Sequence, residues 1–442
     1  MPPDSSIPVP FSPRPSACPG LWRIVSALDG GICRVKLPGG QLSSAQARAV
    51  AAAARTCASG VLELTNRSNL QLRGVRVERQ AELVGGLLAA GLGPRRAEAD
   101  DVRNLLLSPA AGRDRAAQLD VRPLAGQLLD LLEDTPDFHR LSAKFALQLD
   151  GGEALAMLDH PHDLWLAAWP GGTRIAFGLA GGARRQALAS VEPAQVPQLV
   201  ETLLRLFLEL AGAHTRMREL LAELPVAEFL DRLQARLPFA LERAVPALPL
   251  ADTAAAPLGV YVQAQPGLTM LLAGAPLGRV DAAQLDALAE LAEREGSGEL
   301  RLTPWQGVLL PDIPVARMAA VADALGEIGL LLDARAPLAR LLACSGSSGC
   351  VKAHADTKAD ARRLAARLGE HGPAQVHLSG CPRSCAAAHV APYTLLAQPG
   401  GRYHLYRREQ GLAGFGRLLA PSLDIDQAGD WLAALPPSGA PA

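Results

Sequence analysis

The feature that most constrains the fold is an internal repeat. Residues 39–75 and 277–313 align without a gap at an offset of 238 positions. Two matching units so far apart predict a duplicated architecture and not a short solenoid repeat. Identical pairs include Gly40 and Gly278, Gln46 and Gln284, Gly60 and Gly298, Leu62 and Leu300, Leu64 and Leu302, Thr65 and Thr303, and Leu72 and Leu310.

Each copy of the repeat predicts the same order of elements. Two apolar stretches come first, then a helix with a capping box, a strand, a turn, a second strand and a second helix. This order favours an α+β unit with helices on one face of an antiparallel sheet. Because one unit leaves a sheet edge open, we expect the two copies to pair edge to edge around a pseudo-twofold axis. The first copy has apolar stretches at 21–27 and 30–38, capping residues Ser43 and Gln46, strands at 61–65 and 69–75 and a helix at 77–91; the second has 258–264, 268–273, Asp281 and Gln284, 299–303, 307–311 and 315–328.

A longer segment follows each copy. The first, at about 95–225, contains four strand-like stretches, and helical patterns lie at 194–211 and 216–236. The second, at about 330–435, contains three strand-like stretches and a helix near 355–369. A chain of this length is expected to form roughly two to four domains.

Bulk composition excludes several classes of protein. With 49% hydrophobic and 20% charged residues, the 442-residue chain has an ordinary globular profile. A formal net charge of −1 gives no field that favours nucleic acid or an anionic membrane. No run of about 18 apolar residues predicts a membrane span, and the Pro- and Ser-rich residues 1–17 predict a disordered arm without a signal segment. We therefore expect a soluble, cytoplasmic protein that binds neither nucleic acid nor membrane.

Clustered cysteines indicate the chemistry. Four of the seven cysteines, Cys344, Cys350, Cys381 and Cys385, are spaced C-x5-C, then thirty residues, then C-x3-C. A [4Fe–4S] cluster takes one thiolate for each of its four irons, so the pattern predicts such a cluster. The alternative is a structural zinc site, but zinc ligands usually come in C-x2–4-C pairs, which fit the first spacing poorly. Packing or surface roles are expected for the isolated Cys18, Cys33 and Cys57.

The duplication and the cysteine spacing resemble the nitrite/sulfite reductase superfamily, over residues 18–435. The resemblance implies an α+β fold in which two ferredoxin-like half-domains pair as a pseudo-dimer and alternate with two larger α/β domains. It also implies a sirohaem beside the cluster, with the last cysteine, Cys385, bridging to the sirohaem iron. The expected boundaries are a disordered arm at 1–17, a first ferredoxin-like half-domain at 18–92, a first sulfite-reductase-like α/β domain at 93–237, a second half-domain at 238–328, and a second sulfite-reductase-like domain with the cluster at 329–442.

Three further motifs resemble the basic substrate pocket of that family. ELTNRSNLQLRGV supplies Arg67, Gln71 and Arg73, DDVRNLLLSP supplies Arg103 and Asn104, and LSAKFALQLD supplies Lys144. The resemblance implies that these six residues bind the substrate and that Arg67, Arg103 and Lys144 are catalytic. The last motif departs from the family's K-F-K element, because Ala146 replaces the second basic residue. Since alternate residues of a strand share a face, we expect Lys144 and Ala146 on one face, with one cation where the family has two.

That departure narrows the choice among branches of the family. In having one cation there, the chain resembles the precorrin-3B synthases. The opening SACPGLWRIVSALDGGICRVKLPGG and the segment ACSGSSGCVKAHADT resemble the same branch. This branch keeps the cluster, binds no sirohaem, and uses O2 to hydroxylate precorrin-3A and close a γ-lactone in aerobic cobalamin biosynthesis. The alternative is a sirohaem-dependent nitrite or sulfite reductase, although oxyanion reduction would lose electrostatic drive without the second cation. A third reading is an accessory electron-transfer protein that has lost the active site.

The resemblance also implies a mononuclear non-haem iron, whose ligands the sequence leaves open. His160 and His162 lie between Asp159 and Asp163, and two histidines with a carboxylate are the usual set for such iron. The same H-P-H segment is equally typical of a polar loop, and His354 and His389 are weaker candidates. No phosphate-binding G-x-G-x-x-G element follows a strand. Electrons are therefore expected from a separate reductase or ferredoxin-like carrier.

Overall fold

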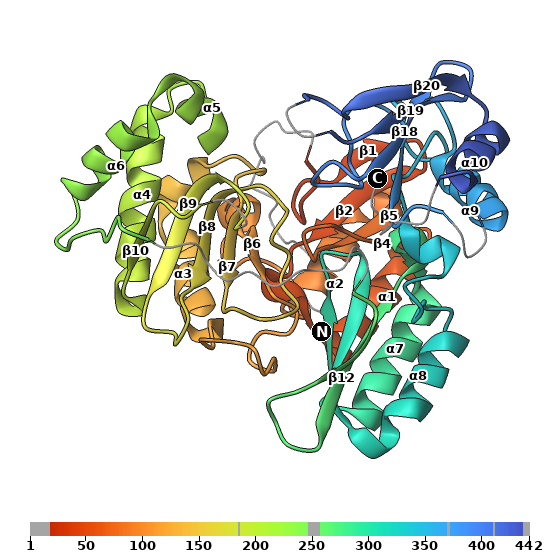
Figure 1. The fold of residues 1–442 in the computed structure, drawn as a ribbon. Coiled ribbons are helices and arrows are strands. Elements are labelled where there is room, and N and C mark those ends of the chain that lie inside the picture. Colours follow the sequence, from red (N-terminus) through yellow and green to blue (C-terminus); the bar gives the residue numbers. More distant parts are fainter. Residues whose placement is uncertain (1–17, 184–185, 246–256, 369–371, 410–411, 436–442) are drawn as a thin grey trace.

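Four five-stranded sheets form the framework of the molecule. The computed structural model describes residues 18–183, 186–245, 257–368, 372–409 and 412–435. The arm expected at 1–17 lies outside these residues. One larger domain lies on one side in Figure 1, and the two repeat units with the C-terminal domain lie on the other. Within the described parts of the chain, no helix is long and apolar enough to cross a membrane.

The two repeat units form two matching antiparallel sheets. Each unit contributes four strands to its own sheet and one short strand to the sheet of the other unit. This reciprocal exchange differs from the simple edge-to-edge pairing that the repeat predicts. The strand orders are β1 (Val25–Ala27), β2 (Gly30–Val35), β5 (Leu70–Val75), β4 (Val61–Leu64) and β13 (Arg279–Asp281) in one sheet, and β11 (Gly259–Val262), β12 (Leu268–Gly274), β15 (Gly307–Pro314), β14 (Glu299–Leu302) and β3 (Gln41–Ser43) in the other.

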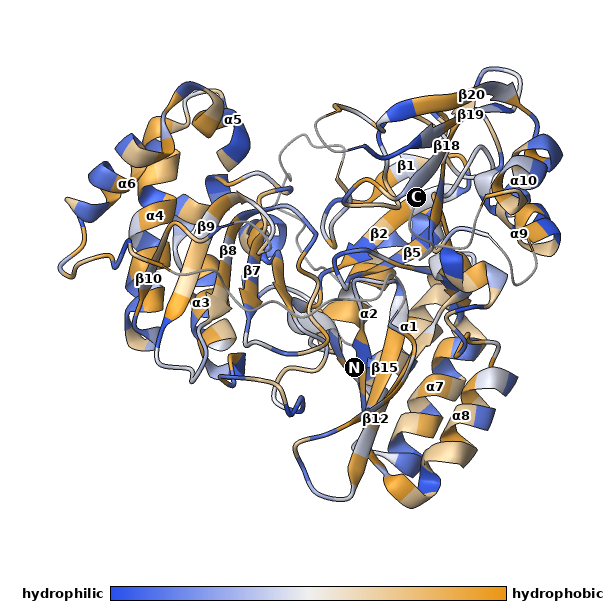
Figure 2. Ribbon diagram, viewed as in Figure 1, coloured by the Kyte–Doolittle hydropathy of each residue, from blue (hydrophilic) through white to orange (hydrophobic). Residues whose placement is uncertain are grey.

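One helix layer covers both repeat sheets. Helices α1 (Ser44–Cys57) and α7 (Ala282–Glu295) pack against each other across the pseudo-twofold axis, and α2 (Gln80–Ala89) and α8 (Met318–Glu327) flank them. Hydrophobic and hydrophilic segments alternate along α8 in Figure 2, as expected of a helix with one buried face. Leucines, valines and alanines of both units share one core, so the pair of units forms a single packed body.

The predicted capping boxes begin both central helices. Asp281 accepts from the Gln284 backbone N–H at 2.8 Å, and Ser43 accepts from the Gln46 N–H at 3.2 Å. Each glutamine returns the contact to the capping residue's own N–H. Both predicted boxes are therefore confirmed.

We expect Asp281→Ala to lower the free energy of unfolding by about 1 kcal/mol, because the first turn of α7 loses its cap. Urea unfolding monitored by circular dichroism would measure the change. Asp231→Ala is the matched control, since its carboxylate only forms an exposed ion pair with Arg243, which contributes roughly 0–1 kcal/mol. Equal losses in the two variants would contradict the capping role.

Identical glycines mark close approaches in both copies. Gly40 and Gly278 adopt positive φ values of 71° and 69°. A Cβ at Gly40 would collide with the carbonyl oxygen of Leu302, and one at Gly278 would press against the Gln306 side chain. Only glycine combines this backbone region with such close neighbours, which explains why both copies contain it.

The first larger domain is a mixed sheet with helices packed on it. Strands β6, β7 and β8 run parallel, and β9 and β10 continue the sheet antiparallel. The prediction of one continuous helix over 216–236 is wrong. The structure has two helices there, separated at Pro225. The elements are β6 (Leu105–Leu107), α3 (Arg122–Asp134), β7 (Leu147–Asp150), β8 (His162–Ala168), β9 (Ile175–Gly181), β10 (Ala189–Val191), α4 (Val196–Leu210), α5 (Met217–Glu223) and α6 (Val226–Gln234).

The C-terminal domain repeats this sheet order. Two parallel pairings are again followed by two antiparallel ones. The duplication visible in the sequence of the half-domains therefore extends to the larger domains, where the sequence alignment does not show it. The elements are β16 (Leu341–Ala343), α9 (Thr357–Leu368), β17 (Val376–Ser379), β18 (Tyr393–Gln398), β19 (Arg402–Arg407), β20 (Arg417–Leu423) and α10 (Ile425–Ala433).

Candidate active site

Arg67 lies on the tight turn between β4 and β5. Ser68, the next residue, adopts a positive φ of 57°, and the Thr65 hydroxyl accepts from the backbone N–H groups of Arg67 and Asn69. Burial and the positive charges of Arg34 and Arg216 lower the pKa of Arg67 to about 10. Arg67 therefore stays protonated at neutral pH, and three guanidinium groups from separate segments meet here.

A pocket of about 240 Å³ opens beside Arg67. It is lined by Arg67, Asn69, Arg103, Asn104, Leu105, Leu106, Ala146, Leu147 and His162. Three of the predicted substrate-binding residues, Arg67, Arg103 and Asn104, thus lie around one cavity. Arg103 forms an ion pair with Glu133 at 2.9 Å, while its buried Nη1 has no hydrogen-bond partner among the described residues. A bound carboxylate would satisfy that donor.

The side chain of Asn104 has a structural role. Its side-chain amide donates to the carbonyl oxygens of Asp101, Ala143 and Phe145. These contacts hold the segment before β7 against the start of β6. The side chain thus shapes the pocket wall and has its donors already occupied.

Lys144 does not lie on a strand face with Ala146. Strand β7 begins at Leu147, and Lys144 is an exposed residue of the turn before it. Ala146 lines the pocket, and its backbone N–H donates to Asp163, which forms a buried ion pair with Arg216. The expectation of a shared strand face is therefore wrong, because the alternation starts one residue after Ala146.

Histidines supply the rest of the polar wall. His160 and His162 are buried, and the ring of His160 lies 5.1 Å from that of His389. Burial, with the nearby positive charge of Arg67, lowers the pKa of His162 to about 3, and burial with neighbouring histidines lowers that of His160 well below its usual value. Both imidazoles are therefore neutral at pH 7. A second pocket, of about 660 Å³, is lined by His160, His389 and Trp305 among others. Its lining includes Ala386, the residue after Cys385.

The four cysteines follow the ends of two parallel strands. Cys344 comes directly after β16, and Cys381 follows β17 by two residues. The Gly380 N–H donates to Cys344 Sγ at 3.2 Å. Partial desolvation and the nearby thiols of Cys344, Cys381 and Cys350 raise the pKa of Cys385, although its side chain keeps contact with solvent. The other three thiols therefore lie near that of Cys385.

The four cysteines have the chemistry of cluster ligands. Four free thiols, each able to bind one iron, match the donor set of a [4Fe–4S] cluster. Among the residues that the structure describes, no group of three His, Cys, Asp or Glu side chains is placed to hold a metal ion. A Cβ at Gly380 would meet Ala353 at 2.6 Å and Cys344 Sγ at 3.3 Å, so this position is restricted to glycine. The donor set and the tight backbone both fit the predicted cluster.

Two arginines of the site were missed by the sequence analysis. Arg34 lies opposite Gln71 in the β2–β5 ladder, and with the amide oxygen of Gln71 facing it, its guanidinium donates at 2.6 and 3.1 Å. Strand alternation could have placed Arg34 beside the pocket. Arg216 lies just before α5, which no local pattern connects to the pocket.

Arg73 points away from the pocket, toward the cysteine segment. Its guanidinium donates to both carboxylate oxygens of Asp29, at 2.8 and 2.7 Å, and to the Gly349 carbonyl oxygen at 3.1 Å. The predicted substrate-binding set thus divides in two, with Arg67 and Arg103 at the pocket and Arg73 behind the cysteines.

Family models match most of the framework. The nitrite/sulfite reductase ferredoxin-like half domain matches residues 28–90 and 261–328, and the nitrite and sulphite reductase 4Fe-4S domain matches 98–241. A ferredoxin–nitrite reductase of Leptolyngbya laminosa is 30% identical over 391 residues, covering 82% of this chain and 76% of the relative. The chain belongs to the nitrite/sulfite reductase family. The predicted fold class is thereby confirmed.

Two further relatives give the scale of the likeness. The chloroplastic ferredoxin–nitrite reductase of Arabidopsis thaliana is 32% identical over 311 residues, which is 65% of this chain and 53% of the relative. The chain thus spans about half the length of this plant relative. The solved structure of the Mycobacterium tuberculosis NirA protein superposes with a TM-score of 0.76 at 24% identity, covering 91% of this chain and 79% of that one. This likeness supports the fold.

Proposed function

We propose that this chain is an iron–sulfur oxidoreductase that acts on a tetrapyrrole substrate, as a precorrin-3B synthase. Cys344, Cys350, Cys381 and Cys385 would hold the [4Fe–4S] cluster. The arginine-lined pocket would hold part of the carboxylate-bearing rim of the macrocycle, as substrate, where reductases of the family hold sirohaem. The observation that carries this choice is the wall formed by Ala146 and neutral His162, with Lys144 outside the pocket.

The reasoning is electrostatic. Reduction of a small oxyanion needs several positive, proton-donating groups at the atom that receives electrons. Here the position of the family's second basic residue is an alanine, and the adjacent imidazole is uncharged. Arginines remain charged and bind carboxylates in a planar, two-point geometry. The pocket is therefore better suited to holding acetate and propionate side chains than to supplying protons.

Each residue of the pocket then has a role. Arg67 and Arg103 would clamp carboxylates of the macrocycle rim, and the Nη1 of Arg103, which has no partner within the described parts of the chain, is available as a donor for that purpose. Gln71 holds Arg34 in place beside them. Lys144 would reach the rim only from its exposed turn. A rim held at several points also brings the acetate that closes the lactone near the carbon that it joins.

The cluster would supply electrons one at a time to the oxygen chemistry. One oxygen atom of O2 enters the product and the other leaves as water, which consumes two electrons and two protons from outside the substrate. A separate reductase or ferredoxin-like carrier would provide the electrons. For the implied mononuclear iron, His160 and His389 are two imidazoles whose ring centroids lie 5.1 Å apart. Among the described residues, no group of three possible ligands includes them.

A second candidate is a sirohaem-dependent nitrite or sulfite reductase. The names of the relatives favour it, since they include ferredoxin–nitrite reductases and a sulfite reductase [ferredoxin] of Mycolicibacterium paratuberculosis that is 27% identical over 435 residues. Arg67 and Arg103 would then hold carboxylates of sirohaem, and Cys385 would be the cluster cysteine that the resemblance connects to it. The two candidates share the cluster and the pocket. They differ in whether the tetrapyrrole is a substrate that leaves after the reaction or a cofactor that remains bound.

An absorption spectrum of anaerobically purified protein separates them. We expect a broad iron–sulfur absorption without the sharp Soret and red bands of a sirohaem. We also expect precorrin-3A to be consumed under air and to persist under argon, because the reaction incorporates oxygen. Sharp sirohaem bands at full occupancy, with nitrite or sulfite reduction by a reduced carrier, would establish the second candidate instead.

A further inference from the structure

A buried carboxylate lies directly behind the cysteine segment. Glu63, on β4, has a side chain only 12% exposed and accepts from the hydroxyl of Ser345, the residue after Cys344, at 3.2 Å. Arg279 donates to it at 2.6 Å, and Arg73 donates at 3.4 Å. The ammonium group of Lys358 lies 3.9 Å away.

This Glu63 network joins three parts of the molecule. Glu63 and Arg73 come from the first half-domain, and Arg279 comes from the exchanged strand β13 of the second. Lys358, on α9, belongs to the cysteine domain and donates to the carbonyl oxygens of Ala343 and Leu277. Arg73 completes the network at the carbonyl oxygen of Gly349, next to Cys350. Both ends of the C-x5-C segment are therefore held through these charges.

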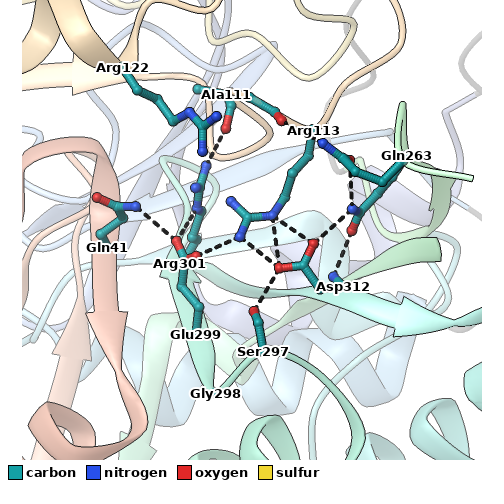
Figure 3. A network of polar contacts seen from close by, with 12 residues as sticks. Gln41, Ala111, Arg113, Arg122, Gln263, Ser297, Gly298, Glu299, Arg301 and Asp312 are labelled. Carbon is teal, nitrogen blue, oxygen red and sulfur yellow. Dashed lines mark hydrogen bonds and ion pairs between the residues drawn. The ribbon is translucent and has the colours of Figure 1, made fainter.

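The pseudo-twofold counterpart shows what such a network does. Arg301 matches Glu63 at the repeat offset and donates to the carbonyl oxygen of Pro109 at 3.0 Å. It also donates to the carbonyl oxygen of Ala111 at 2.8 Å (Figure 3). Those residues belong to the segment after β6, which corresponds to the cysteine segment after β16. In both places a buried charge on the half-domain sheet fixes the segment that follows the first parallel strand. In this second place the segment contains no cysteine.

The two networks differ in their charge. The one in Figure 3 has three arginines, Arg113, Arg122 and Arg301. The three carboxylates are Glu299, Asp312 and Asp120, which pairs with Arg122, so its sum is zero. The Glu63 network has Arg73, Arg279 and Lys358 against Glu63 and Asp29, so three cations face two anions and the sum is +1. A net positive charge next to four thiolates favours the reduced cluster, which is one electron more negative.

We infer that Glu63 is a positioning residue of the cluster: it fixes the Cys344–Cys350 segment on the half-domain pair, and its charge helps to set the cluster's reduction potential. The inference goes beyond the proposed function, because it depends on the cluster and not on the identity of the substrate. Removing the carboxylate raises the potential, since the surroundings become more positive. Removing Arg279 lowers it for the opposite reason.

The test is a redox titration of the purified protein under argon, followed by EPR of the reduced cluster. The variants are Glu63→Gln, which keeps an acceptor oxygen for Ser345, and Arg279→Gln. Glu295→Gln is the matched control, because Glu295 is also held by two arginines, Arg294 and Arg317, and none of the three contacts the cysteine segment. Iron and acid-labile sulfide per chain are measured in parallel.

We expect the midpoint potential to shift upward in Glu63→Gln and downward in Arg279→Gln, with no shift in Glu295→Gln. A Glu63→Gln midpoint equal to that of the control, at full iron content, would overturn the inference. If Glu63→Gln does not accumulate as folded protein, Arg279→Gln decides alone, and an unchanged or higher midpoint there counts against it. Wild-type protein without iron and sulfide would instead contradict the cluster itself, whatever its substrate.

Discussion

Cys385→Ser is expected to remove both the cluster and turnover. A serine hydroxyl stays protonated at neutral pH and is a poor ligand for iron, so the cluster would have three thiolates for four irons. Cys385 is the most solvent-exposed of the four cysteines, so the substitution itself leaves the core packing intact. We expect iron, sulfide and the EPR signal of the reduced cluster to fall to background.

The matched control for this variant is Cys57→Ser. Cys57 lies at the end of α1, far along the chain from the cysteine segments, and is one of the isolated cysteines. Its replacement should leave iron and sulfide per chain unchanged. A Cys385→Ser protein with the EPR signal at full strength would remove Cys385 from the ligand set.

Arg67→Ala is expected to weaken tetrapyrrole binding by about ten- to a hundredfold, since one charge-assisted hydrogen bond contributes roughly 1.5–3 kcal/mol. The unbound protein should not lose comparable stability. Arg67 is close to the positive charges of Arg34 and Arg216, which lower its pKa, so removing it relieves repulsion. Titration of the tetrapyrrole under argon, followed by absorption, would give both dissociation constants.

Arg48→Ala serves as the control for Arg67→Ala. Arg48 forms an exposed ion pair with Glu293 on the helix layer, away from the pocket. Its loss should leave the dissociation constant unchanged. An unchanged constant in Arg67→Ala as well would exclude Arg67 from the pocket, whichever tetrapyrrole binds there.

Much of the framework could be predicted from local signals. The capping boxes that begin α1 and α7 follow from residues three positions apart, and the shared glycines Gly40 and Gly278 follow from the repeat itself. Such features depend on neighbours along the chain. The strand exchange between the half-domains depends on contacts between residues far apart, and the repeat alone does not distinguish exchange from simple pairing.

The site was predicted in part, for a related reason. The family resemblance implied that Arg67 and Arg103 belong to one substrate pocket, and both line the same cavity. The motifs did not show that Arg73 points toward Gly349. What a strand residue contacts depends on which domain covers its side of the sheet, and the sequence motif does not contain that information. Arg216 reaches the pocket only through its ion pair with Asp163, which the order of residues does not indicate.

The exchanged strands also affect how the chain matures during synthesis. One edge of β4 pairs with β5, and the other pairs with β13, Arg279–Asp281. The ribosome synthesises β13 after the whole first larger domain. Until then the first half-domain emerges with an unpaired strand edge, which is a site for association with other chains. The intervening domain has its own core and five strands, so it can fold in that interval. Slow translation between the two halves would therefore prolong the stage in which this strand edge is unpaired.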